Sequence, residues 1–236
     1  MGIRRGEITT DIIRNGLVFN MDAANRASYV PNATTSFNTI DLSKSGSFVN
    51  DPTYISPPTS ASCWDFDGTD DYINCGASTL SGETALTISS WIYPISYGGA
   101  AAESMVSTEL SSPNRGFYLA LYNAQNFRWQ VSTNGSAKDS LDTVGGTVTL
   151  NAWQHVLAVW TQSTMSLYIN GVLSKTQSTS NATGTFTTTN NLLLGARLSS
   201  AGFFEGNIAN VQIYNRALSS TEVLHNYNGL KGRFGL

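Results

Sequence analysis

Hydrophobic and polar positions along the chain follow the period of β-strands. Residues 17–22, Leu-Val-Phe-Asn-Met-Asp, alternate apolar and polar side chains, as a half-buried strand does. Strand signals become regular from residue 84 onward, and Asn170-Gly171 indicates a tight turn between two of them. The pattern predicts further strands at 84–93, 104–108, 115–122, 126–132, 153–161, 164–170 and 208–214.

The stretch before residue 84 gives weaker signals. Residues 25–62 are rich in Ser, Thr, Asn and Pro, and Pro57-Pro58 would break any long strand. We expect extended surface chain there, with one strand near 46–50.

One helix is predicted near the C-terminus. Ser219 stands three residues before Glu222, which is the spacing of a capping box, where each side chain accepts the other residue's backbone N–H. Gly229 would suit the end of this helix. The apolar stripe of the helix is expected to consist of Val223, Leu224 and Tyr227.

No linker or change in composition divides the sequence, so a single domain is predicted over residues 16–229. An arginine-rich arm, 1–15, precedes it, and a tail, 230–236, follows it. Apolar residues in the arm and the tail are expected to dock on neighbouring subunits. These assembly contacts are Ile12, Ile13, Phe234 and Leu236.

The composition agrees with an all-β fold. The chain contains 29 Ser, 26 Thr and 21 Asn, and only 12% of its residues are charged, against about 25% in typical soluble domains. Its net charge of −3 and aromatic content of 11% exclude a disordered chain. Coiled coils need Ala, Glu, Lys and Leu in bulk, which this sequence lacks.

The charge pattern limits the partners as well. With 13 basic and 16 acidic residues, the sequence lacks the positive footprint of a nucleic-acid-binding protein. It contains no apolar run of about 18 residues that would predict a transmembrane span. Residues 1–14 lack the apolar core of a secretory signal.

Paired carboxylates, which a retaining glycoside hydrolase needs roughly 5–5.5 Å apart, are not predicted. No two glutamates are spaced i, i+2 or i, i+4. Asp65 and Asp67 have the first spacing, but they lie beside a turn, where Asp commonly forms the turn itself. His155 and His225, the only histidines, are expected to be structural. We therefore expect a protein that is not an enzyme.

The acidic turn with Asp67, Asp70 and Asp71 is the candidate cation site. Its carboxylates are suitable ligands for Ca²⁺, which prefers oxygen atoms, although the spacing is not that of an EF-hand loop. Asp22 is a further candidate ligand. The alternative is a solvated turn without a metal ion.

Cys63 and Cys75 flank this turn. If 67–71 were the loop of a hairpin, the two residues would face each other, and a cross-strand disulfide would be feasible. Two reduced, partly buried thiols are the alternative, which a chain made in a cytoplasm favours.

Aromatic residues divide into core and surface candidates. All five tryptophans lie in strand patterns with apolar neighbours, so core packing is the expected role for most of them. Tyr97, Phe203 and Phe204 lie in predicted loops and are the candidates for stacking on sugar rings.

An ordered series of motifs covers about residues 16–229. It comprises Leu17-Val-Phe-Asn-Met-Asp22, Phe66-Asp-Gly-Thr-Asp-Asp-Tyr-Ile73, Leu86-Thr-Ile-Ser-Ser-Trp91, Trp153-Gln-His155, Met165-Ser-Leu-Tyr-Ile-Asn-Gly171, Leu192-Leu-Leu-Gly195 and Gly206 to Val223. The series resembles the laminin-G-like family of concanavalin A-type jelly rolls, which implies two antiparallel sheets and no general catalytic motif. Many members bind Ca²⁺ at the rim, but Ala209 and Asn210 stand where the family pattern has acidic residues.

Asp22-Ala-Ala-Asn and the ending 227–234 resemble single-domain forms among virion proteins of marine tailed phages, cyanophages in particular. That resemblance implies a structural protein on the virion surface, a capsid decoration or tail component made in the host cytoplasm. Its partners would be other virion proteins and further copies of the chain. The alternative is a lectin-like module that binds a host-surface glycan.

Overall fold

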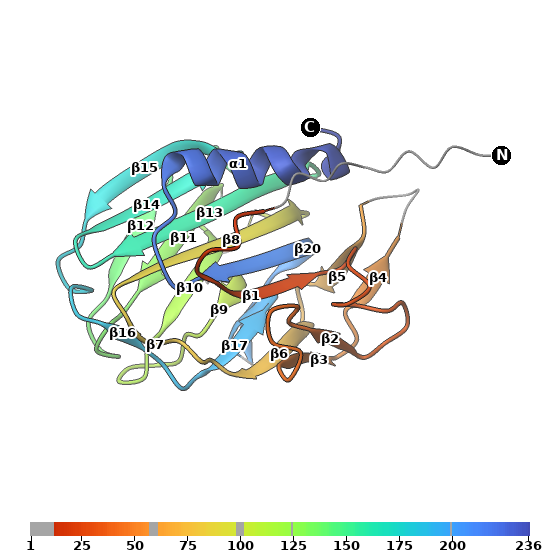
Figure 1. The fold of residues 1–236 in the computed structure, drawn as a ribbon, viewed down its shortest axis with the longest axis horizontal. Helices are drawn as coiled ribbons and strands as arrows, with labels where there is room; N and C mark the ends of the chain where they lie inside the picture. The colour runs from red at the N-terminus through yellow and green to blue at the C-terminus, as the bar shows by residue number, and fades with distance from the viewer. Residues whose placement is uncertain (1–11, 57–60, 98–101, 124, 199) are drawn as a thin grey trace.

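The computed structural model describes residues 12–236 except 57–60, 98–101, 124 and 199. Two antiparallel sheets, each of eight strands, stack face to face, and one helix lies across the outer side of the first sheet (Figure 1). The prediction of an all-β, two-sheet jelly roll with one C-terminal helix is confirmed.

Both sheets mix strands from distant parts of the sequence. In pairing order, the first sheet contains β15 (Val172–Ser178), β14 (Thr164–Ile169), β13 (Gln154–Thr161), β8 (Ala85–Pro94), β20 (Glu205–Tyr214), β5 (Cys63–Asp67) and β4 (Thr53–Ile55), with β1 (Leu17–Asp22) also paired to β20. The second sheet contains β12 (Asp139–Asp142), β11 (Asn126–Val131), β10 (Phe117–Tyr122), β9 (Glu103–Ser107), β17 (Asn191–Leu194), β6 (Tyr72–Ala77), β3 (Ser45–Val49) and β2 (Thr35–Phe37). Two short pairs are β7 (Ser81–Glu83) with β16 (Phe186–Thr187) and β18 (Ala196–Leu198) with β19 (Ala201–Phe203).

Each strand predicted from a periodic segment is present, with its ends shifted by at most three residues. Residues 25–62 differ from the expectation, because they hold the strands β2, β3 and β4 instead of one. Both β2 and β4 span three residues. Such a length is too short for alternation to be recognised in a sequence.

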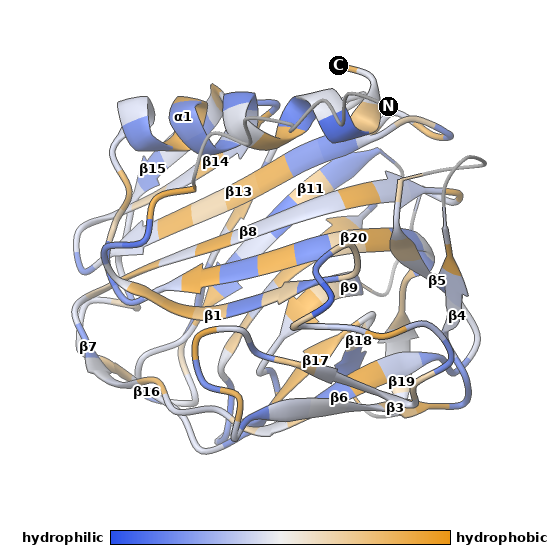
Figure 2. Cartoon of the chain, turned by 45° about the vertical axis from the view of Figure 1, so that its right-hand side comes forward, coloured by the Kyte–Doolittle hydropathy of each residue, from blue (hydrophilic) through white to orange (hydrophobic). Residues whose placement is uncertain are grey.

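The core lies between the two sheets. Apolar and polar bands alternate along β20 (Figure 2). Strand β13 is instead apolar without a break from Val156 to Trp160, and its Val156, Ala158 and Trp160 point into this core. Leu157 and Val159 point to the other side of the sheet, where α1 (Ser220–Leu230) covers them. Both faces of β13 are therefore apolar, as expected of a strand covered on both sides.

Helix α1 begins as predicted. The Ser219 hydroxyl accepts the Glu222 N–H at 3.3 Å, and the Glu222 carboxylate accepts the Ser219 N–H at 2.8 Å. Within the described residues, no helix is long and apolar enough to cross a membrane.

The apolar stripe and the end of α1 differ from the prediction. Leu224 is 45% exposed, and Asn226 is buried in its place, where it donates to the Tyr214 hydroxyl. Gly229 does not end the helix, because the chain continues into a 3₁₀ turn, η1 (Lys231–Phe234). Gly235 ends that turn with a φ of 74°, a conformation that glycine adopts without strain.

Three of the four expected assembly contacts pack within their own chain, and their docking on neighbours stays a prediction. Ile12 and Ile13 pack against the cluster under α1, and the Ile13 carbonyl accepts the Tyr214 hydroxyl at 3.0 Å. Phe234 is buried and stacks on Trp91. Leu236 is 49% exposed, and its role as a contact stays a prediction. The rest of the expected arm, residues 1–11, lies outside the described residues.

The hairpin that would have brought Cys63 and Cys75 face to face does not form, and the alternative of two reduced thiols holds. Strand β5 belongs to the first sheet and β6 to the second, so the turn between them crosses from one sheet to the other. The two cysteines therefore lie in different sheets and form no disulfide, and burial raises the pKa of the Cys75 thiol.

Asp139, at the start of β12, anchors the loop that follows β15. Its carboxylate accepts the backbone N–H groups of Ser180, Asn181 and Ala182 at 2.8–2.9 Å. Burial opposes ionisation, but these hydrogen bonds lower the pKa of Asp139 to about 2.

We expect Asp139→Asn to lower the free energy of unfolding by about 2 kcal/mol at pH 7, since a neutral amide replaces a charged acceptor. Because the pKa is depressed in the folded state, this contribution is present above about pH 4 and disappears as the pH falls toward 2. Urea unfolding of both proteins at pH 7 and pH 2.5 measures it. A difference that is equal at the two pH values would contradict the assignment.

Candidate functional site

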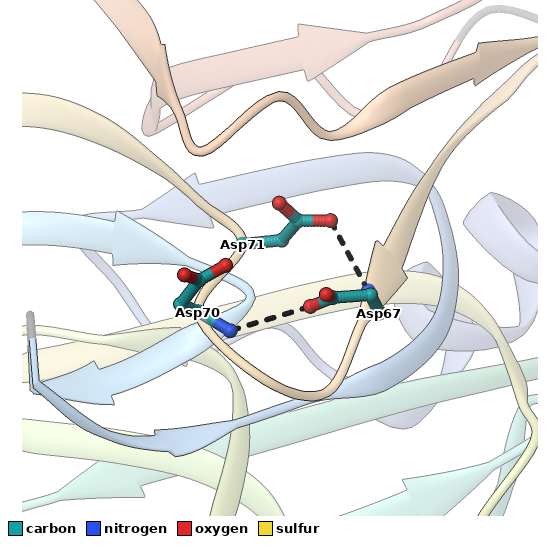
Figure 3. Close-up of side chains that lie close together, drawn as sticks. All are labelled: Asp67, Asp70 and Asp71. Carbon is teal, nitrogen blue, oxygen red and sulfur yellow. Dashed lines mark hydrogen bonds between the residues drawn. The ribbon is translucent and has the colours of Figure 1, made fainter.

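The acidic turn after β5 brings three carboxylates together. One ligating oxygen each from Asp67, Asp70 and Asp71 lies within 4.8 Å of the others (Figure 3). The Asp67 carboxylate accepts the N–H groups of Thr69 at 2.8 Å and Asp70 at 3.3 Å, and Asp71 accepts the Asp67 N–H at 3.2 Å. The carboxylates thus hold the turn that carries the chain between the two sheets.

The environments of these carboxylates differ. Burial raises the pKa of Asp71 to about 6, opposed by the Asp67 N–H and assisted by the charges of Asp67 and Asp70. The Thr69 N–H lowers the pKa of Asp67. Calcium at this turn stays a prediction, because the hydrogen bonds within the turn already account for its geometry.

Asp22 is not part of this group. Its two carboxylate oxygens accept the two terminal nitrogens of Arg233 at 2.8 and 2.9 Å, in a bidentate ion pair. The expectation of Asp22 as a metal ligand is therefore corrected: an arginine occupies both of its oxygens.

We expect Asp71→Asn to stabilise the protein at pH 7 by about 1 kcal/mol, because it removes a buried charge next to two others and keeps an acceptor for Asp67. The sign follows from the raised pKa: the wild type gains stability as the pH falls from about 6 toward 4. The advantage of the variant should be much smaller at pH 4.5 than at pH 7. Denaturant unfolding in EDTA at both pH values measures this, and a variant less stable than the wild type at pH 7 would refute it. Repeating the denaturant unfolding of the wild type in calcium tests the cation prediction, because calcium bound at this turn would raise the free energy of unfolding.

A row of aromatic rings lies on the outer face of the first sheet. Phe234 of η1 stacks on Trp91 with ring centroids 4.1 Å apart. Trp153, which directly precedes β13, lies 4.7 Å from Phe234, and Tyr93 of β8 lies 5.6 Å from Trp153. Trp91 is fully buried, whereas Trp153 and Tyr93 are half-buried at the end of the row.

An open pocket of about 560 Å³ lies at this end of the row. Two polar side chains contribute to it: Asn207 of β20, whose buried Oδ1 has no hydrogen-bond partner among the described residues, and Arg233, which Asp22 holds in place. Aromatic faces combined with a few oriented polar groups are typical of a site for a small polar ligand. The pocket is lined by Ile55, Ala61, Tyr93, Trp153, Asn207, Arg233 and Phe234.

The aromatic residues predicted to bind sugar lie elsewhere. Phe204 is fully buried in the core between the sheets, so its predicted exposure is wrong. Phe203 is half-buried and lies 6.4 Å from the ring of Tyr72. Tyr97 is 36% exposed, and its role as a glycan contact stays a prediction.

The sequence analysis expected most of the five tryptophans in the core, did not single out Trp153 and missed the pocket. The sequence does indicate that Trp153 faces away from Trp160. Alternation along 153–161 puts Trp153 on the same side of the strand as His155 and opposite to Trp160. His155 is buried beside Trp91, and burial lowers its pKa to about 3. Asn207 and Arg233 carried no sequence signal, since only the fold brings them next to Trp153.

Carboxylates also occur along β5 and β20. Asp67 pairs in register with Glu205, and Asp65 lies two residues away on the same side of β5. Burial raises the pKa of Asp65, and the charges of Asp67 and Glu205 act in the same direction. A catalytic pair of two glutamates on one strand, which the sequence did not predict, is absent from the described strands.

A family model described as the concanavalin A-like lectin/glucanases superfamily matches residues 67–224. No curated protein matches the sequence significantly.

Solved structures with a similar fold are binding domains of clostridial toxins. The receptor binding domain of botulinum neurotoxin D superposes with a TM-score of 0.67 at 17% identity, over 91% of this chain and 52% of that one. The binding domain of Paraclostridial Mosquitocidal Protein 1 gives 0.67 at 15% identity, over 90% and 52%. The ligand binding domain of botulinum neurotoxin serotype D in complex with N-acetylneuraminic acid gives 0.66 at 17%, over 91% and 51%. The chain spans about half the length of these structures, and the likeness shows the fold.

Proposed function

The chain belongs to the concanavalin A-like lectin/glucanases superfamily, and on this basis we propose that it is a carbohydrate-binding domain without catalytic activity. The pocket beside Trp153 carries the proposal. An apolar sugar face would stack on Trp153 and Tyr93, and a sugar hydroxyl would donate to the orphan oxygen of Asn207.

The partly satisfied polar groups of the pocket support this ligand class. A buried amide oxygen without a donor costs about 1–3 kcal/mol, and a hydroxyl-bearing ligand would supply the missing donor. Arg233 lines the pocket, and its bidentate pair with Asp22 holds the guanidinium donor in a fixed orientation.

The structural neighbours favour the same class. One of them was solved in complex with N-acetylneuraminic acid, and others are receptor binding domains. Because this chain corresponds to about half of each, saccharide binding by this half is part of the proposal.

A glycan array tests the proposal. We expect the purified chain to bind a group of related saccharides and to keep that specificity in EDTA, because the pocket contains no carboxylate cluster. An array without a reproducible hit, in either calcium or EDTA, would exclude carbohydrate binding as the function.

Hydrolysis of β-glucans is the control, since the superfamily includes glucanases. We expect no release of reducing sugar. Activity that disappears in Asp65→Asn would instead favour an enzyme that uses Asp65, Asp67 and Glu205.

A second candidate function is a structural role on a phage virion, which the resemblance of the ending 227–234 suggested. Exposed apolar side chains on the edge strand β15 and on α1 favour a contact with another subunit: Val172 of β15 is 67% exposed, Leu173 of β15 49% and Leu224 of α1 45%. The two functions are compatible, since a decoration protein can also bind glycans. Absence of the chain from purified virions would exclude the structural role.

A further inference from the structure

The outer face of the second sheet gathers charge in a chain that has little. Four of its 13 basic residues and two of its 16 acidic residues interact there, which leaves a net charge of +2 on a molecule of −3. We call this group the basic face. It consists of Glu109, Arg115, Arg128, Lys138, Asp142 and Arg197.

Two ion pairs neutralise four of these six groups. The Glu109 carboxylate is buried and accepts Arg115 at 3.1 Å. Asp142 accepts Arg128 at 2.6 Å through each oxygen. The surplus positive charge therefore belongs to Arg197 and Lys138.

Arg197 is the arginine of the basic face that forms no ion pair with another described residue. It is half-buried on β18, and its buried Nε–H has no hydrogen-bond acceptor in the described part of the chain. The hydroxyl of Ser107, on β9, donates to the Arg197 carbonyl at 3.0 Å, which fixes the backbone beside the face. A buried guanidinium N–H without an acceptor is costly unless another molecule supplies one.

Further donors on this face lack acceptors. The buried Nε–H of Arg115 and the buried hydroxyl of Ser104 have no partner among the described residues. Ser104 pairs in register with Ala120 of β10, so it lies on the same side of the sheet as Tyr118, which packs with Ala120. The Tyr118 hydroxyl donates to Gln130, and the Gln130 amide donates to Glu109. The donors of Tyr118 and Gln130 therefore already have acceptors. What the face lacks is acceptors.

From this geometry we infer that the basic face binds the carboxylate or sulfate group of an acidic saccharide, with Arg197 as the principal contact. A guanidinium binds either group with paired hydrogen bonds. Burial lowers the pKa of Lys138, and the charges of Arg115, Arg128 and Arg197 act in the same direction, opposed by the charge of Glu109.

The inference rests on the proposed function for the saccharide, but it concerns the opposite sheet from the pocket beside Trp153. Variants can therefore separate the two. Arg197→Gln removes the charge and breaks no described ion pair, so the fold is expected to survive. Arg26→Gln, at an exposed position in the loop after β1, is the matched control for the charge change.

Calorimetric titration with 3′-sialyllactose, a heparin-derived disaccharide and neutral lactose tests the inference. We expect one or both acidic ligands to bind at least about tenfold more weakly to Arg197→Gln than to Arg26→Gln, and binding to weaken between 0.05 and 0.5 M NaCl. The ligand that binds distinguishes a carboxylate from a sulfate.

Equal affinities of Arg197→Gln and Arg26→Gln, or no binding of either acidic ligand, would overturn the inference. If saccharide binding is lost in Trp153→Ala but kept in Arg197→Gln, the inference fails and the proposed function stands. If an acidic ligand binds Trp153→Ala normally but not Arg197→Gln, the basic face is confirmed independently of the pocket.

Discussion

Trp153→Ala is expected to weaken binding of the saccharide found on the array by at least about 30-fold. The ring supplies the exposed end of the aromatic row, and removing a central aromatic contact typically costs 2 kcal/mol or more. Trp153→Phe keeps an aromatic face and should lose only a few-fold. Titration calorimetry with the array hit measures both affinities.

Tyr97→Ala is the matched control for this variant. Tyr97 is an exposed aromatic residue outside the pocket and is the loop residue that the sequence favoured. We expect it to bind like the wild type. If Tyr97→Ala loses affinity and Trp153→Ala does not, the sugar binds at the loop and the pocket is not the site.

Phe234→Ala is expected to lower the free energy of unfolding by about 3–4 kcal/mol. Its ring is 8% exposed and contacts both Trp91 and Trp153, so truncation leaves a cavity between η1 and the first sheet. The same substitution removes a wall of the pocket, so saccharide affinity should fall as well. Denaturant unfolding and calorimetry on one preparation measure the two effects.

Leu236→Ala is the control for Phe234→Ala, because it truncates an exposed apolar side chain two residues further along the same tail. Leu236 is 49% exposed, and we expect a change within about 0.5 kcal/mol. Equal stability of Phe234→Ala and Leu236→Ala would show that the tail does not pack on the sheet in solution.

The strands with alternating apolar and polar side chains, such as β1 and β14, were predictable because burial on one side of a strand imprints a two-residue repeat. At the turn that begins at Asp67, the sequence left open whether the chain forms a hairpin. Local sequence indicates a tight turn, but it does not state whether the chain returns to the same sheet or crosses to the other.

The candidate site was less predictable. Trp153 and Phe234 are separated by most of the second half of the chain, and only the docking of η1 on the first sheet places their rings 4.7 Å apart. Arg197 and Arg115 likewise reach one face from different elements. A single sequence holds no record of such long-range juxtapositions.

The indole N–H resonances of the five tryptophans test the central claim most directly. Trp64, Trp91, Trp129 and Trp160 are fully buried, and Trp153 alone lines the pocket. On addition of the array hit, we predict that the Trp153 indole resonance, identified by its absence in Trp153→Phe, shifts in a saturable manner while those of Trp64, Trp129 and Trp160 stay in place. Saccharide binding that leaves the Trp153 resonance unmoved would contradict the account.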